Sequence, residues 1–107
     1  GEPIVQVVLP SSLSLMAVQG KTAFDANCAS CHGPNGSGRD GLAPPLIHKI
    51  YEPSHHSDMA FTLAVRQGVR AHHWRFGNMA PVEGVSETSI ESIVAYIREL
   101  QRANGIY

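Results

Sequence analysis

The chain has 107 residues, of which 43% are apolar and 16% charged, and its net charge at pH 7 is −1 with neutral histidines. This is the length of a single domain. The sequence has no basic stripe, and its longest apolar stretch, residues 4–9, is far shorter than the ~20 residues of a membrane-spanning helix. A nucleic-acid partner and a membrane span are therefore not expected.

The first residues, GEPIVQVVLP, are rich in Val, Ile and Leu, and a proline stands near each end of this run. Such a composition predicts an extended arm or a short strand. We therefore expect an N-terminal arm over residues 1–12 and one domain over residues 13–107. The run has neither the basic start nor the long apolar core of a secretory signal peptide, so we expect no signal peptide within it.

Residues 13–27 have helical spacing of apolar positions, and Ser11 and Ser12 are the candidate N-caps. Gly20 and Phe24 lie four positions apart and are predicted to share one face of this helix. Glycine in a helix interior costs about 1 kcal/mol relative to alanine. Gly20 therefore predicts that another element approaches the helix too closely for a side chain.

Residues 33–46, GPNGSGRDGLAPPL, contain the glycines and prolines of a loop. An irregular segment of this length is uncommon unless it has a function, and wrapping the edge of a cofactor would be one. A second helix is predicted to begin after a cap at Ser57 or Asp58 and to run to about Gln67. Gly68 is its expected C-terminal stop.

Residues 69–85 are again irregular, and a last helix is predicted to begin at Ser86 or at Thr88. Asn104 and Gly105 end it. Apolar residues recur along it at helical spacing, at Ile90, Ile93, Val94, Ile97 and Leu100. The sequence therefore predicts an all-α fold with three main helices and long loops.

The pentapeptide CASCH at residues 28–32 is the pattern by which c-type haem is attached. Cys28 and Cys31 are about one helical turn apart and can bond to two vinyl groups of one haem, while His32 can reach the iron. A zinc site normally needs four ligands, and a thioredoxin-like pair expects a βαβ context. These two alternatives, and two cysteines without a role, are disfavoured against one covalent haem c.

Met79 lies in an irregular segment shortly before the last predicted helix, next to Pro81. A thioether sulfur is a suitable ligand for haem iron, and a Met/His ligand pair raises the reduction potential. Met16, at an expected core position of the first helix, and Met59, at the start of the second, are the competing methionines. We predict that the iron ligands are His32 and Met79.

In its motifs the chain resembles class I cytochromes c of the bacterial type, which carry a single haem in an all-α cytochrome c fold. The resemblance is carried by four segments: GKTAFDANCASCHGPNGSG at 20–38, APPL at 43–46, GNMAP at 77–81 and SIESIVAYIREL at 89–100. It implies that Gly20 and Phe24 pack crosswise against Ile93 and Tyr96 of the last helix. This crossing would explain the glycine within the first helix.

The resemblance also implies contacts around the haem. The carbonyl of Pro44 would accept a hydrogen bond from the ring of His32 and orient it, and Leu46 would cover the same haem face. Trp74 is the single tryptophan. Its indole N–H could donate to a haem propionate, or the residue could be an ordinary core aromatic.

Five further histidines have three interpretations. His48, His55, His56, His72 and His73 could be loop residues bonded to backbone carbonyls and water, which we favour. Two or more of the four paired ones, at 55–56 and 72–73, could instead hold a second metal such as copper or zinc. In the third interpretation His72 or His73 is an alternative sixth ligand of the iron.

These features predict a soluble one-electron carrier, exported to the bacterial periplasm, between a donor and an acceptor redox protein. A six-coordinate iron leaves no open position for a substrate, so no enzymatic activity is expected. One alternative is a permanent subunit of a larger oxidoreductase, or a dimer, docked through the apolar residues 4–9. Another is a haem sensor in which Met79 is a labile ligand.

Overall fold

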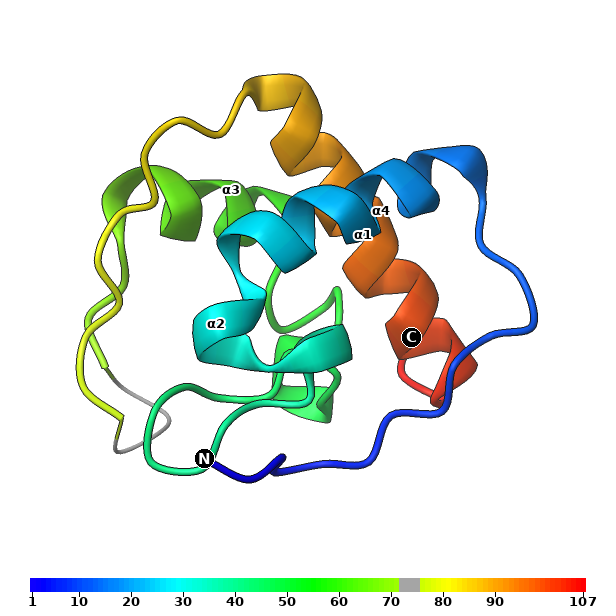
Figure 1. Ribbon diagram of the computed structural model, residues 1–107, viewed down its shortest axis with the longest axis horizontal. Coiled ribbons are helices and arrows are strands. Elements are labelled where there is room, and N and C mark those ends of the chain that lie inside the picture. The colour runs from blue at the N-terminus through cyan, green and yellow to red at the C-terminus, as the bar shows by residue number, and fades with distance from the viewer. Residues whose placement is uncertain (72–75) are drawn as a thin grey trace.

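The computed structural model describes residues 1–71 and 76–107, and within these the chain is all-α, with isolated bridges but no β-strand (Figure 1). The α-helices are α1 (Leu15–Asn27), α2 (Ala29–His32), α3 (Asp58–Gln67) and α4 (Glu87–Ala103). Two 3₁₀ turns, η1 (Pro34–Gly36) and η2 (Lys49–Tyr51), lie in the loops between α2 and α3. The predicted fold class is confirmed, and the pentapeptide adds the one-turn helix α2 to the three predicted helices.

Helix α1 begins two residues later than predicted, because its N-cap is Ser14 rather than Ser11 or Ser12. The Ser14 hydroxyl oxygen accepts a hydrogen bond from the backbone N–H of Ala17 at 3.1 Å. Its backbone N–H donates to Oε1 of Glu99 at 3.0 Å, and its hydroxyl donates to the other oxygen of that carboxylate. A residue of α4 therefore fixes the start of α1, and the local sequence could not reveal this.

The crossing of α1 and α4 forms the centre of the fold (Figure 1). A Cβ atom on Gly20 would overlap the carbonyl oxygen of Ser92 and lie 2.9 Å from Cβ of Tyr96. The rings of Phe24 and Tyr96 are 5.5 Å apart at their centroids with an interplanar angle of 54°, and Ile93 is buried beside them. The predicted close approach at Gly20 is confirmed.

The other helix boundaries follow the predicted caps. Ser57 precedes α3 in an extended conformation, and Gly68 ends it with a φ of +77°, a conformation that glycine adopts without strain. The hydroxyl oxygen of Ser86 accepts from the backbone N–H of Ser89 at 3.1 Å, so α4 begins at the first of its two candidate caps and not at Thr88.

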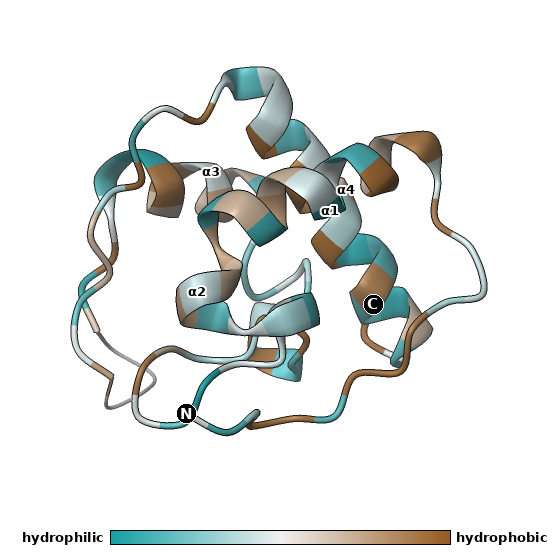
Figure 2. Cartoon of the chain, in the orientation of Figure 1, coloured by the Kyte–Doolittle hydropathy of each residue, from teal (hydrophilic) through white to brown (hydrophobic). Residues whose placement is uncertain are grey.

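Met16 is 50% exposed, so its predicted place in the core is wrong. The buried positions of α1 are Ala17, Gly20 and Phe24, and Met16 lies about 100° around the helix from Ala17. Apolar residues at the N-terminal end of α1 and along the arm lie outside the central helix crossing (Figure 2). The expected face of α1 is therefore confirmed at Gly20 and Phe24, but it does not continue one turn back to Met16.

The N-terminal arm is extended and packs on its own domain without joining a strand. The backbone N–H groups of Ile4 and Val5 both donate to the carbonyl of Ser37 at 3.1 Å. Further along, Oδ1 of Asn104 accepts from the N–H of Val8 at 2.8 Å, and Nδ2 of Asn104 donates to its carbonyl at 2.9 Å. The arm thus runs from the loop after α2 to the C-terminal end of α4 (Figure 1).

Replacing Asn104 by alanine should release the arm. Both hydrogen bonds to Val8 and the bond to the carbonyl of Leu100 are lost, so we expect the unfolding free energy to fall by about 1–2 kcal/mol. Thermolysin, which cuts before apolar residues, should cleave the arm several times faster in Asn104→Ala than in the unaltered chain. Arg102→Ala, an exposed change in the same turn, is the control, and equal cleavage rates in both variants would contradict the anchoring role.

Candidate functional site

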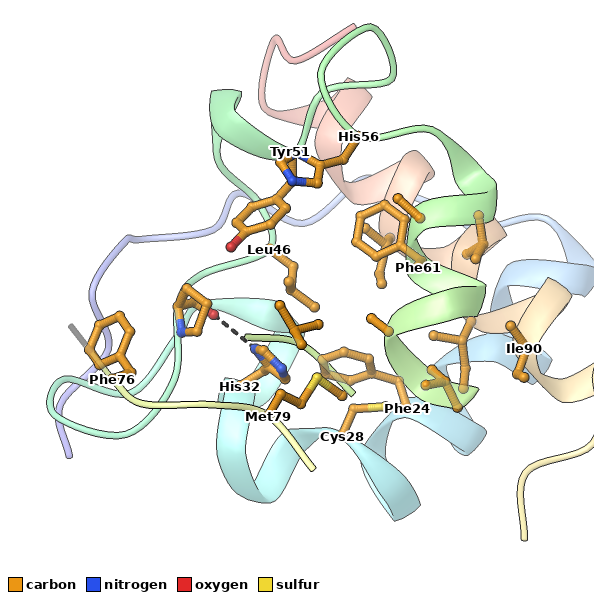
Figure 3. A pocket seen from close by; sticks show the side chains of 18 of the residues that line it. Phe24, Cys28, His32, Leu46, Tyr51, His56, Phe61, Phe76, Met79 and Ile90 are labelled. Atoms are coloured by element: carbon orange, nitrogen blue, oxygen red, sulfur yellow. Dashed lines mark hydrogen bonds between the residues drawn. The ribbon is translucent and has the colours of Figure 1, made fainter. Parts of the chain in front are cut away.

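An apolar cleft lies between α1, α3 and α4 and the segments that follow α2 and α3 (Figure 3). Together with its open mouth it holds about 1000 Å³ of space between side chains. Aliphatic and aromatic groups form most of its wall. Among the described residues that line it, the titratable side chains are those of Cys28, His32, Tyr51 and His56. Such a wall suits a large, flat and mostly apolar ligand.

His32 ends α2 and is 9% exposed. Its Nδ1 lies 2.9 Å from the carbonyl oxygen of Pro44. Because a carbonyl only accepts, Nδ1 carries the proton and donates it, which leaves the lone pair on Nε2 available to a metal. Burial lowers the pKa of His32 below its ordinary value, and the bond to Pro44 opposes this only in part. The imidazole is therefore neutral at pH 7.

Cys28 lines the cleft half-buried, whereas Cys31 is exposed, and neither forms a disulfide. Burial, reinforced by the nearby Cys31 thiol, raises the pKa of Cys28 to about 11. Reactive cysteines of thioredoxin-like proteins have a lowered pKa instead. The Cys28 thiol is thus a protonated neighbour of His32, and the thioredoxin-like alternative finds no support in its surroundings.

Met79 lines the same cleft as His32, although it comes from the segment after α3 (Figure 3). That segment is fixed by an antiparallel bridge, in which Met79 and Val69 exchange backbone hydrogen bonds of 2.8 and 2.9 Å. The competing methionines, Met16 and Met59, are 50% and 61% exposed and do not line the cleft. The structure therefore brings the predicted pair of sulfur and imidazole to one place.

The remaining predicted site residues have different outcomes. Leu46 is 8% exposed and lines the cleft, as Pro44 does, and its predicted contact with the haem face stays a prediction. Trp74 lies outside the described residues, and its proposed bond to a propionate stays a prediction. Next to Met79, a residue outside the predicted set, Asn78, accepts a hydrogen bond at Oδ1 from the backbone N–H of Ala71 at 2.8 Å.

Several aromatic residues of the cleft were not predicted from the sequence. The rings of Tyr51 and His56 are 4.8 Å apart at their centroids, and that of Phe61 is 6.3 Å from Tyr51. All three line the cleft, and so does Phe76. The available signal was the recurrence of aromatic residues at 51, 56 and 61, which matches no regular helical or strand period.

The histidines outside α2 fit the interpretation as loop residues where the structure describes them. His48 accepts from the backbone N–H of Ile50 at 3.1 Å, and Nδ1 of His56 donates to the carbonyl of the same residue at 2.7 Å. His55 stacks on His56. Over residues 1–71 and 76–107 there is no group of three metal-ligating side chains. Residues 72–73 lie outside this part, so their two histidines remain untested.

Known proteins resemble this chain over most of its length. A family model described as cytochrome c matches residues 17–101. Cytochrome c-554(547) of Halothiobacillus neapolitanus is 32% identical over 93 residues, which cover 79% of this chain and 97% of that protein. The cbb3-type cytochrome c oxidase subunit FixP of Azorhizobium caulinodans is 33% identical over 98 residues, which cover 88% of this chain. The match spans only about a third of FixP, 32% of its length.

The residues around the cleft are chemically suited to haem c. Cys28 and Cys31 offer two adjacent thiols, His32 a neutral imidazole with a free Nε2, and Met79 a thioether sulfur. The apolar wall matches the porphyrin. The family match covers most of the chain and includes all four residues. The chain therefore belongs to the cytochrome c family, whose covalently bound haem c serves electron transfer.

Proposed function

We propose that this protein is a one-electron carrier with a single haem ligated by His32 and Met79, passing electrons between a donor and an acceptor redox protein. The observation that carries the proposal is that His32 and Met79 line the same apolar cleft. In the sequence they are separated by all of α3 and two loops. Cys28 and Cys31 would provide the two thioether bonds.

Each residue has a distinct role in this proposal. His32 ligates the iron through Nε2, while its Nδ1–H bond to Pro44 fixes the ring plane and the tautomer. Met79 would supply a thioether ligand from a segment that the bridge to Val69 holds in place. Leu46 and Pro44 cover the histidine side and exclude water. The haem would supply the one-electron redox change, while His32 and Met79 would hold its iron.

Tyr51 and His56 lie together at the end of the cleft away from Cys28 (Figure 3). Haem c is apolar along the edge that carries the thioethers and bears two carboxylates on another edge. If Cys28 fixes the first edge, the polar tips of Tyr51 and His56 are suited to the carboxylate edge. We assign them to that side of the haem, where Trp74 is the further candidate.

Covalent attachment is the first test. Protein produced in cells that mature c-type cytochromes should gain the mass of one haem and titrate reversibly with one electron. The double variant Cys28→Ser, Cys31→Ser should lose nearly all covalent haem, because no thioether can form. Ser30→Ala, an exposed change within the pentapeptide, should keep it. An unchanged mass of the unaltered protein, or a two-electron titration, would contradict the proposal.

A permanent place in a larger oxidoreductase is the second candidate, because one relative is named as a cytochrome c oxidase subunit. Docking through residues 4–9 would use Val8 and Leu9, which are 65% and 57% exposed, since Ile4 and Val7 are half-buried against the domain. In residues 1–71 and 76–107 no helix has the length and apolarity to cross a membrane. Gel filtration decides: elution at the monomer mass favours the carrier, and a stable dimer favours docking.

We place the carrier in the bacterial periplasm. The support is the cytochrome c family of the chain and its two bacterial relatives. Fractionation of the native host should find the haem-bound chain in the periplasmic fraction, and recovery from the cytoplasm would contradict this placement.

A further inference from the structure

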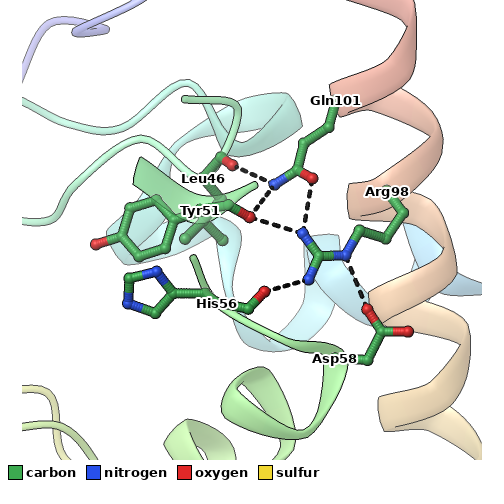
Figure 4. A network of polar contacts seen from close by, with 6 residues as sticks. All are labelled: Leu46, Tyr51, His56, Asp58, Arg98 and Gln101. Atoms are coloured by element: carbon green, nitrogen blue, oxygen red, sulfur yellow. Dashed lines mark hydrogen bonds and ion pairs between the residues drawn. The ribbon is translucent and has the colours of Figure 1, made fainter. Parts of the chain in front are cut away.

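A buried arginine lies directly behind one wall of the cleft (Figure 4). The side chain of Arg98, on α4, is 7% exposed. Its Nε donates to Oδ1 of Asp58 at 2.8 Å, and its Nη1 to the carbonyl of Tyr51 at 2.6 Å and to Oε1 of Gln101 at 2.8 Å. Its Nη2 donates to the carbonyl of His56. Every nitrogen of the guanidinium thus has a partner.

Three of the residues that Arg98 contacts line the cleft. Tyr51 and His56 line it, and so does Phe61, whose ring centroid is 4.9 Å from the guanidinium carbon. Gln101 extends the network, since its Nε2 donates to the carbonyls of Leu46 at 3.0 Å and of Tyr51 at 2.9 Å. The cation is therefore one layer of residues away from the space that the haem is proposed to fill.

The surroundings of this charge favour a long-range effect. A guanidinium keeps its charge at any ordinary pH, and Arg98 is the only buried and permanently charged side chain in the described parts of the chain. None of the described residues that line the cleft carries a carboxylate or a second cation. Asp58, the counter-charge, is 70% exposed, so water screens the carboxylate more than the guanidinium. The cleft therefore experiences a net positive potential.

We propose that Arg98 raises the reduction potential of the haem, and that Asp58 moderates this effect. When the ferric haem accepts one electron from a donor redox protein, its net charge falls by one, and a nearby cation stabilises the form with the lower charge. Arg98 is a positioning residue as well, because its hydrogen bonds hold the wall at Tyr51 and His56. This inference rests on the proposed function, since it requires a haem in the cleft.

The direction in which each variant shifts the reduction potential distinguishes an effect of the charge of Arg98 from its structural role. Asp58→Asn keeps an acceptor for Nε but removes the negative charge, so the ratio of reduced to oxidised protein at a fixed ambient potential should rise about threefold. Arg98→Met should lower that ratio about tenfold. Arg98→Lys, which keeps the charge but loses the fork of hydrogen bonds, should lose stability while the ratio stays within about twofold of the original.

Equilibrium redox titrations of the haem-bound variants at pH 7 measure these ratios. Lys21→Met is the control, because it also removes one cation, from an exposed pair with Asp25, and should leave the ratio unchanged. A merely structural wall predicts a fall of the ratio in both Arg98 variants and no rise in Asp58→Asn, which keeps the hydrogen bond to Nε. That pattern, or no change in Asp58→Asn, would overturn the inference.

The haem content of each variant is measured first, by mass and by absorption spectrum. Absence of covalent haem in the unaltered protein would reject the proposed function itself. Covalent haem with an unaltered spectrum, but without shifts of opposite sign, would reject only the role of Arg98. If Arg98→Met does not fold, Asp58→Asn decides, because its side chain is exposed and remains able to accept the same hydrogen bond.

Discussion

The reduction potential of the haem-bound protein should fall in Met79→Ala by on the order of a tenth of a volt or more, because axial ligands set haem potentials over a range of about 0.8 V. Loss of the thioether removes the ligand that favours ferrous iron and opens one axial position to water. The absorption spectrum should change to that of a high-spin iron, and the reduced variant should bind carbon monoxide.

Met59→Ala is the matched control for this change. Met59 is 61% exposed and does not line the cleft, so its loss should leave both the potential and the spectrum unaltered. An unaltered low-spin spectrum in Met79→Ala would mean that another residue ligates the iron. His72 and His73 would then be tested next, because they shortly precede Met79 in the sequence and were the alternative sixth ligands.

Replacing Gly20 by alanine should destabilise the crossing of α1 and α4. Alanine is intrinsically better in a helix by about 1 kcal/mol, but its Cβ overlaps the carbonyl of Ser92, and such overpacking typically costs 1–3 kcal/mol and occasionally more. Backbone cannot move aside as a side chain tip can, so we place this site at the upper end. We expect the unfolding free energy to fall by about 2 kcal/mol or more, measured by urea denaturation of the haem-bound protein.

Gln19→Ala is the control that tests whether the loss of stability in Gly20→Ala arises at the crossing of α1 and α4. Gln19 is the neighbouring residue on the exposed face of α1, so its replacement should change the stability by less than about 0.5 kcal/mol. A Gly20→Ala protein as stable as this control would show that α1 and α4 can separate at little cost, and the contact of Phe24 with Tyr96 would then not hold the fold.

Much of the site was predictable because short, local patterns encode it. The pentapeptide sets the spacing of Cys28, Cys31 and His32 within one helical turn. Gly20 signals a close approach without showing its partner. Met79 could be singled out because it is the methionine in an irregular segment, whereas helical residues such as Met16 have packing as an alternative role.

Other features depend on contacts between distant parts of the chain. Arg98 acquires its surroundings from Asp58, 40 positions earlier, and from carbonyl groups of the loop before it. Ser14 caps α1 because Glu99 of α4 reaches it. The helical pattern of α1 placed Gly20 and Phe24 correctly, but it did not tell that the covered face continues through Ala17 rather than Met16. No local period contains such information, since tertiary packing overrides it.

Carbon monoxide, offered to the reduced haem-bound protein at neutral pH, distinguishes an electron carrier from a ligand sensor. With His32 and Met79 both bound to iron, no axial position is open, and the absorption spectrum of the reduced protein should not change. Rapid conversion to a carbon monoxide complex in the unaltered protein would contradict stable ligation by Met79, and with it the assignment of this chain as a carrier.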